Sequence, residues 1–318
     1  MRFVKRARTA LAILALSASA CGSSGALANT EQYRPPPPLA LVVLVDPSSG
    51  SMADQLRQLE DVIRASASPN ESVVVMMLQT GSARQYVVRP GDSLSSIAAA
   101  NGLTLSTVEA VNPQFGPVSG RNWSVIHSGE RVTLPDGAAR DPLLLATRAP
   151  AGPPPPQLMR IPRAPSNPTD YQRAQYSHTV ANNNAVNASR VAAWRAEADR
   201  AVQPWQSQVV GQLEKKTGTQ ILVTSSSGGP ALSTSIGVGL TTLSGLSGRR
   251  TLLLLGGGDS PATLAPRSLV DVTLVIANVS DPQAVAAWKS AGVAAGAPSV
   301  NALDPALTQL QLAQIVNQ

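Results

Sequence analysis

The sequence is poor in the residues that enzymes most often use for catalysis. Its 318 residues include one cysteine and two histidines, and His127 and His178 lie in unrelated segments. The chain has no H-E-x-x-H motif, no Ser/His/Asp signature and no phosphate-binding loop that combines glycines with a lysine. Paired carboxylates for glycoside cleavage are a spatial arrangement that a sequence does not reveal. We therefore expect a protein that is not an enzyme.

Aromatic residues and clusters of positive charge are also scarce. Phe, Trp and Tyr make up 3% of the chain, so the core must be built from Val, Leu, Ile and Ala. Much of the formal charge of +6 lies before Cys21, where no acid occurs and the basic residues are Arg2, Lys5, Arg6 and Arg8. The rest of the chain carries +2 without a Lys/Arg cluster, which argues against nucleic-acid binding.

Residues 1–20 have the features of an export signal. A basic start precedes the apolar residues 11–18, a segment too short to span a bilayer. Residues 19–22 (SACG) resemble the lipobox of bacterial lipoproteins, which implies that Cys21 is lipidated and becomes the mature N-terminus. The alternative is ordinary cleavage after an A-x-A site. Lipidation predicts a membrane-anchored protein on the extracytoplasmic side of the cell envelope, with residues 21–38 as a proline-rich tether.

The strongest fold signal follows this tether. Residues 39–45 are a continuous apolar run, which is typical of a central parallel strand buried on both faces. The next segment has apolar residues at the spacing of one helical face: Leu56, Leu59, Val62 and Ile63. Strand, polar turn and helix together predict the first unit of a doubly wound sheet. Ligands of such sheets bind outside the carboxyl ends of the strands.

Residues 42–52 (VVLVDPSSGSM) resemble the first strand and metal-binding turn of von Willebrand factor A domains, whose usual motif is D-x-S-x-S. Asp46 and Ser48 match this motif, whereas Gly50 takes the place of the second serine; a shifted register uses Ser51 instead. The resemblance implies a divalent cation such as Mg²⁺, held also by Thr234 and by Asp259 after a later strand. The alternative is a degenerate domain that uses the same surface for metal-free contact with an envelope protein.

The rest of the chain continues the α/β pattern. A long helical stretch from residue 169 has one apolar stripe, in which Pro204 is expected to kink or split the helix. Further strands are expected at 72–78, 220–224, 251–255, 272–277 and 300–303, and helices at 235–243, 282–291 and 305–316. We therefore predict a doubly wound, mostly parallel sheet resembling a von Willebrand A domain. Its two parts, residues 39–80 and 169–318, are separated by an insertion and by a proline-rich linker at 137–168.

The insertion, residues 85–136, has a different pattern. It contains YVVRPGDSLSSIAAANGLTLSTVEAVNP at 86–113 and GERVTLP at 129–135. The residues predict a strand, a helix capped by Ser93 and stopped by Gly102, a second helix, and a return strand. This order resembles a LysM module, a small βααβ fold that binds peptidoglycan, chitin or other glycans containing N-acetylglucosamine. One departure is that the connection at 114–128 is longer than usual.

The LysM resemblance implies a sugar groove between two loops. One wall corresponds to Gly91, Asp92, Ser93 and Leu94, and the other to Asn112, Pro113 and Gln114. Backbone groups of such loops can bond acetamido substituents, while apolar surfaces contact the sugar rings. Phe115 and Trp123 lie in the long connection, where they either stack on sugar or pack inside the module.

Together these features predict a cell-envelope lipoprotein that binds peptidoglycan through the LysM module and an unidentified envelope protein through the sheet. The first alternative is a cell-wall hydrolase, or an accessory subunit of one, that LysM targets to the wall. The second is a structural spacer in which the groove is vestigial.

Overall fold

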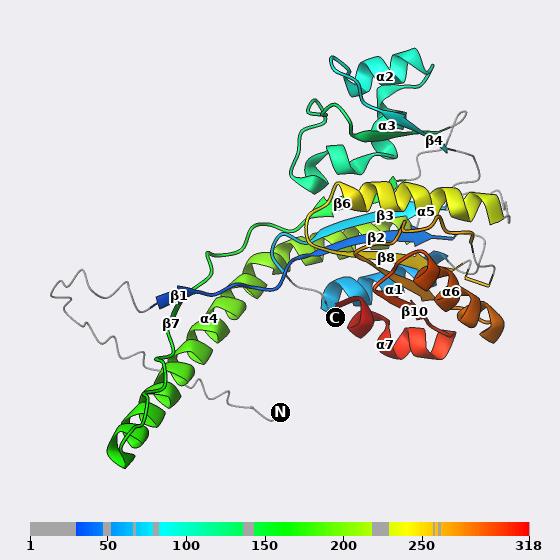
Figure 1. Cartoon of the computed structure of the whole chain (residues 1–318). Coiled ribbons are helices and arrows are strands. Elements are labelled where there is room, and N and C mark those ends of the chain that lie inside the picture. The colour runs from blue at the N-terminus through cyan, green and yellow to red at the C-terminus, as the bar shows by residue number, and fades with distance from the viewer. Residues whose placement is uncertain are drawn as a thin grey trace, which may run out of the picture. The chain divides into compact units, whose positions relative to one another are not determined.

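The computed structural model describes residues 30–46, 52–65, 68–78, 83–135, 143–217, 229–256, 258–259 and 262–317 (Figure 1). They belong to two compact units. Of the described residues, the smaller unit contains those within 30–33 and 156–190, and the larger unit contains those within 34–155 and 191–317. The predicted export signal and Cys21 lie outside the described residues.

The larger unit is built on a sheet that has six strands among the described residues. All of them are parallel except β6 at one edge. In spatial order they are β10 (Ser299–Ala302), β9 (Val272–Ala277), β8 (Arg249–Leu255), β2 (Leu39–Val45), β3 (Ser72–Met77) and β6 (Leu143–Arg148). After β3 the chain forms the insertion, and it then returns to the sheet at β6 and later at β8. Both β3 and β8 pair with β2. The predicted α/β class and mostly parallel sheet are confirmed.

Helices cover both faces of this sheet, which explains why β2 is apolar at every position. Its residues alternate between two core clusters, with Leu41 and Val43 in one and Val42 and Leu44 in the other, and every side chain of the strand is buried. One face packs against α1 (Met52–Ala65), α7 (Pro305–Asn317) and the later part of α4 (Asp170–Thr217). The other face packs against α5 (Gly229–Ser244) and α6 (Pro282–Ala294). Figure 1 shows α5 and α7 on opposite sides of the sheet.

The strand order reverses between β2 and β8, since β3 lies on one side of β2 and the later strands lie on the other. Ligand sites of doubly wound sheets form at the carboxyl ends of strands at such a point. Asp46 and Gly256 follow these two strands, and Asp46 N donates to Leu255 O at 2.9 Å. The loop residues 47–51, which include Ser48 and Ser51, lie outside the described part of the chain.

The segment at 137–168, which the sequence predicts as a proline-rich linker, contains two strands. In β6, Leu144 and Leu145 are buried, and the strand pairs antiparallel with β3. A second, short strand is β7 (Gln157–Met159). The sequence analysis missed β6 for three reasons. The segment is rich in prolines, the partner strand β3 lies far away in sequence, and the burial of β6 does not alternate. The strand expected at 220–224 lies outside the described residues.

The long helix α4 continues through Pro204, so the helix is not split there, which was one of the two predicted alternatives. Pro204 is exposed, so the carbonyl that loses its helical partner can be hydrated by water. The predicted apolar stripe is buried from Ala198 to Leu213. Trp205 lies in the core, and its Nε1 donates to Thr147 Oγ1 of β6 at 2.9 Å.

In the smaller unit, the first part of α4 binds the backbone of an extended segment. The segment includes β7, which pairs antiparallel with β1 (Thr30–Gln32). The Asn187 side chain donates to Met159 O at 2.8 Å and accepts from Met159 N at 2.7 Å, as a neighbouring strand would. Asn183 Nδ2 donates to Arg160 O, and Arg190 Nη1 donates to Gln157 O. Residues 30–32, at the end of the predicted tether, are therefore paired in a strand.

Replacing Asn187 with alanine should open β7 locally. The change removes two hydrogen bonds, which are worth about 1–2 kcal/mol together. We expect the Met159 amide to exchange with solvent roughly tenfold faster, measured by hydrogen–deuterium exchange. Asn184→Ala, at an exposed position of the same helix, is the control and should leave this exchange unchanged. Equal protection in both variants would contradict the structural role of Asn187.

Candidate functional site

Residues 83–135 form a small module with its own core. Its elements are β4 (Ala83–Val87), α2 (Leu94–Ala100), α3 (Leu105–Ala110), two short 3₁₀ helices η2 (Pro113–Phe115) and η3 (Pro117–Ser119), and β5 (Arg131–Pro135). The strands β4 and β5 pair antiparallel. The core cluster consists of Val88, Leu94, Ile97, Ala98, Val108, Phe115, Val132 and Leu134. The predicted strand–helix–helix–strand order is present.

The first predicted groove loop is fixed by Asp92. Its Oδ2 accepts from Arg89 N at 2.7 Å and from Tyr86 Oη at 2.8 Å, and Gly91 makes the turn at a φ of +87°. The hydrogen bond from Arg89 N, and then the one from Tyr86, hold the pKa of Asp92 below its ordinary value. The same bond to Asp92 raises the pKa of Tyr86. The loop is therefore locked in one conformation while Asp92 is ionised.

Ser93 joins this loop to α2. Its Oγ accepts from Ser96 N at 3.1 Å while its own N donates to Ser96 Oγ at 2.9 Å, so the predicted N-cap is confirmed as a reciprocal capping box. The next residue, Leu94, points into the module core and is 3% exposed. Of the four residues predicted for the first wall, Gly91, Asp92 and Ser93 are thus at least partly accessible.

The second predicted groove loop is organised by Asn112, which is fully buried. Its Nδ2 donates to Val108 O and to Thr133 O, both at 2.7 Å, and its Oδ1 accepts from Thr133 N at 2.7 Å. Gln114 Nε2 also donates to Asn112 Oδ1, at 3.1 Å. Asn112 therefore ties the end of α3 to β5 and to η2.

The side chains of Asn112, Pro113 and Gln114 are all buried. Both loops are anchored in the same core. Leu94 of the first loop and Phe115, which follows the second loop, belong to one cluster. Whether glycan contacts these seven residues stays a prediction. The structure assigns Asn112 a supporting role, and Asn112 holds its wall through buried hydrogen bonds.

Both aromatic rings of the long connection at 114–128 pack on the module core, Phe115 fully and Trp123 in part. Phe115 is 2% exposed, and the Arg121 guanidinium lies 5.3 Å from its ring centroid. The half-buried Trp123 ring packs on Gly116, where a Cβ would lie 2.4 Å from the ring. For Phe115 the packing alternative therefore holds over stacking on sugar.

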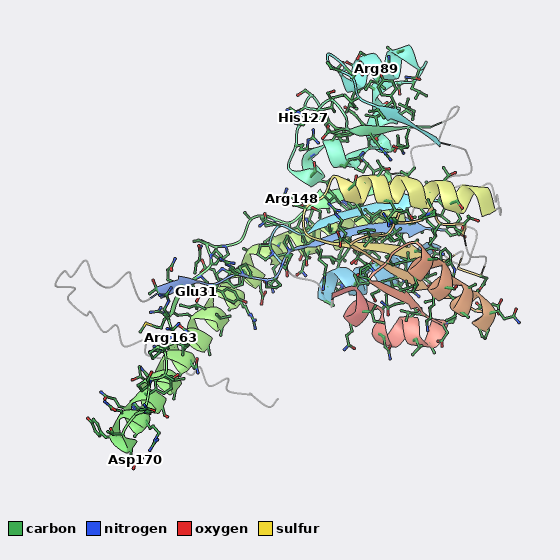
Figure 2. The ribbon with its side chains drawn as sticks, in the orientation of Figure 1. Glu31, Arg89, His127, Arg148, Arg163 and Asp170 are labelled. Atoms are coloured by element: carbon green, nitrogen blue, oxygen red, sulfur yellow. The ribbon has the colours of Figure 1, made fainter. Side chains whose placement is uncertain are left out.

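An ion pair that the sequence analysis missed joins Arg121 of this connection to Glu130, just beyond its end. Arg121 Nη1 lies 2.6 Å from Glu130 Oε1, and His127 N donates to Glu130 Oε2 at 2.7 Å. Burial raises the pKa of Glu130, but the hydrogen bonds from Arg121 and from His127 N outweigh it, so the net pKa is lowered. Figure 2 shows the exposed His127 on this connection and Arg89 beside the first loop.

The predicted metal ligands at the sheet edge are only partly described. Thr234 lies in α5, and Asp259 Oδ1 accepts from Ser280 N and Asp281 N, which orders the start of α6. Within the described ranges, no three acidic, His or Cys side chains gather as a metal-binding group. The ion stays a prediction.

Amide side chains, which the sequence analysis did not single out, fill the same edge. Gln55 Nε2 donates to Asp46 O at 2.9 Å. Gln58 of α1 and Asn278 after β9 exchange side-chain hydrogen bonds, and Asn278 N donates to Thr308 Oγ1 of α7. This edge is therefore polar, and hydrogen bonds join it to α1 and α7.

Comparison with known families identifies the module. A family model described as the LysM domain matches residues 86–135. The chain therefore contains a LysM domain, and the matched residues span nearly the whole described module. A search of curated proteins gives no match to the chain. Among the helices of the described residues, none combines the length and the apolarity needed to cross a membrane.

The acid stability of the first loop should depend on Tyr86. Because the folded-state pKa of Asp92 is lowered, its contribution to stability is present above the unfolded-state pKa and is lost as the pH falls through the folded-state pKa. In Tyr86→Phe the folded pKa should move up toward the unfolded value, so the loss begins at higher pH. NMR titration of the Asp92 carboxyl carbon measures this. Tyr171→Phe, in the smaller unit, should leave the midpoint unchanged, and an unchanged midpoint in Tyr86→Phe would refute the coupling.

Asn112→Ala should destabilise the module strongly. It leaves buried groups of Val108 and Thr133 without partners, which costs about 3 kcal/mol. The Thr133 amide should therefore exchange with solvent more than a hundredfold faster in a hydrogen-exchange experiment. The control is Asn122→Ala in an exposed turn, where a change of less than about 1 kcal/mol is expected. Similar exchange in both variants would show that Asn112 does not hold the module together.

Proposed function

We propose that this protein is a non-catalytic component of the bacterial cell envelope that binds peptidoglycan or a related N-acetylglucosamine glycan. The observation that carries this proposal is the LysM match over residues 86–135, which coincides with a folded module. LysM domains bind glycans of this class and are typical of extracytoplasmic proteins.

The geometry of the first loop supports glycan binding. Its turn is accessible at Gly91, and the hydrogen bonds to Asp92 hold its backbone in one conformation before any ligand arrives. A preformed loop loses little conformational entropy on binding, which favours affinity for a weakly binding sugar. Backbone donors and acceptors at the turn are suited to acetamido groups.

We further propose that a lipid on Cys21 anchors the chain and that the von Willebrand A-like sheet contacts an envelope protein. The reversal of strand order between β2 and β8, and the polar residues beyond their carboxyl ends, support a contact surface at that edge. Anchor, glycan module and sheet would then act together. Two modest contacts on one chain raise each other's effective concentration, so neither contact needs high affinity.

The alternative is a cell-wall hydrolase, or an accessory subunit of one, that the LysM domain targets to its substrate. The two functions differ in one product. Purified sacculi incubated with a hydrolase release soluble muropeptides, whereas sacculi incubated with a binding protein do not.

Co-sedimentation with purified sacculi tests the proposal. The full chain should pellet with sacculi without releasing muropeptides, and Asp92→Ala should weaken binding at least tenfold because the first loop loses its internal acceptor. Asp61→Ala, at an exposed position of α1, makes the same change of charge and should bind like the unmodified chain. Failure of the unmodified chain to pellet would refute the proposal and favour a vestigial groove.

A further inference from the structure

The connection after α3 belongs to two cores at once. Phe115 of η2 lies in the core of the LysM module, whereas Val118 of η3 lies in the core cluster between the sheet and α5. Val118 is 3% exposed. The module is therefore joined to the sheet by a buried apolar contact as well as by its two chain connections.

Polar and close backbone contacts surround Val118. The buried Ser72 Oγ of β3 donates to Val118 O at 3.0 Å. Next to η3, Gly120 has a φ of +76°, and the Arg148 guanidinium of β6 occupies the space that a Cβ there would need. Figure 2 shows Arg148 at the sheet end of the module. Strands β3 and β6 thus hold η3 directly.

A second contact reaches the groove wall itself. At Gly245, just after α5, a Cβ would lie 2.5 Å from Gln114 Cβ and 2.8 Å from Gln114 Cγ, so Gln114 packs directly on this glycine. Gln114 Nε2 donates to Asn112 Oδ1, and Asn112 holds the wall to β5. A continuous chain of contacts therefore runs from the end of α5 to the second wall of the predicted groove.

We propose that the sheet, together with α5, holds the second wall of the LysM groove in its glycan-binding conformation. Gly245 and Val118 are the positioning residues. This inference rests on the proposed glycan binding. Neither residue contacts the sugar. Gly245 leaves room for Gln114, and Val118 fixes η3, so that Asn112, Pro113 and Gln114 lie at a set distance from the first loop. Binding of glycan and docking of the module on the sheet are then energetically coupled.

The test adds a single methyl group at each of two glycines. Gly245→Ala places a Cβ against Gln114, whereas Gly237→Ala, on α5, places one in open space. Neither glycine has a positive φ, so alanine is compatible with both backbones. Calorimetric titration of the full chain with a soluble N-acetylglucosamine oligomer gives the affinity, and circular dichroism sets a temperature at which each variant is folded.

We expect Gly245→Ala to raise the Kd about tenfold, which is in the ordinary range of coupling between sites. Gly237→Ala should bind like the unmodified chain. Val118→Ala, which removes the anchor from the other side of η3, should weaken binding in the same direction. A residue with a merely structural role would lower the unfolding temperature and leave the Kd of the folded protein unchanged.

Two outcomes would overturn the inference, and they are distinguishable. If the unmodified chain binds the oligomer and Gly245→Ala and Val118→Ala bind it equally well, the sheet does not position the groove, and the proposed function stands. If the unmodified chain binds neither the oligomer nor sacculi, glycan binding itself fails, and the inference fails with it.

Discussion

Burial of β2 on both faces is the constraint on which the larger unit depends. Seven consecutive apolar residues leave no side of Leu39–Val45 that water can solvate, so the strand requires neighbours on both edges and helices on both faces. β3 and β8 supply the edges, although the LysM module and a long helix separate them in sequence. The same pairing brings the carboxyl ends of the strands together, where Gln55, Gln58 and Asn278 form a polar edge.

The LysM module is stabilised differently from the sheet. It is small, and it depends on hydrogen bonds within its loops as well as on its core. Asp92 closes one loop and Asn112 the other, each by accepting or donating bonds to backbone groups a short distance away. Such bonds fix loop conformation before a ligand is present. They also make the loops rigid, which is compatible with the proposed binding of a repeating glycan polymer.

The connection after α3 links these two parts. Between its two short helices the Trp123 ring packs closely on Gly116. Phe115 then fills the module core and Val118 fills the sheet core. An insertion joined by flexible loops alone would move freely, whereas this one is packed against α5, β3 and β6. Removing the module would therefore expose part of the sheet, which is why single substitutions are better tests of its role.

Local patterns in the sequence determined the α/β class, the buried run of β2, the Ser93 cap and the LysM module, since each is carried by one short segment or by a succession of short segments. Only the tertiary structure decided that β6 closes the sheet amid prolines, that α4 passes through Pro204, and that Gln114 packs on Gly245. These features depend on partners far away in sequence. The missing Cβ of Gly245 matters only because Gln114 lies beside it, and no local pattern encodes that distance.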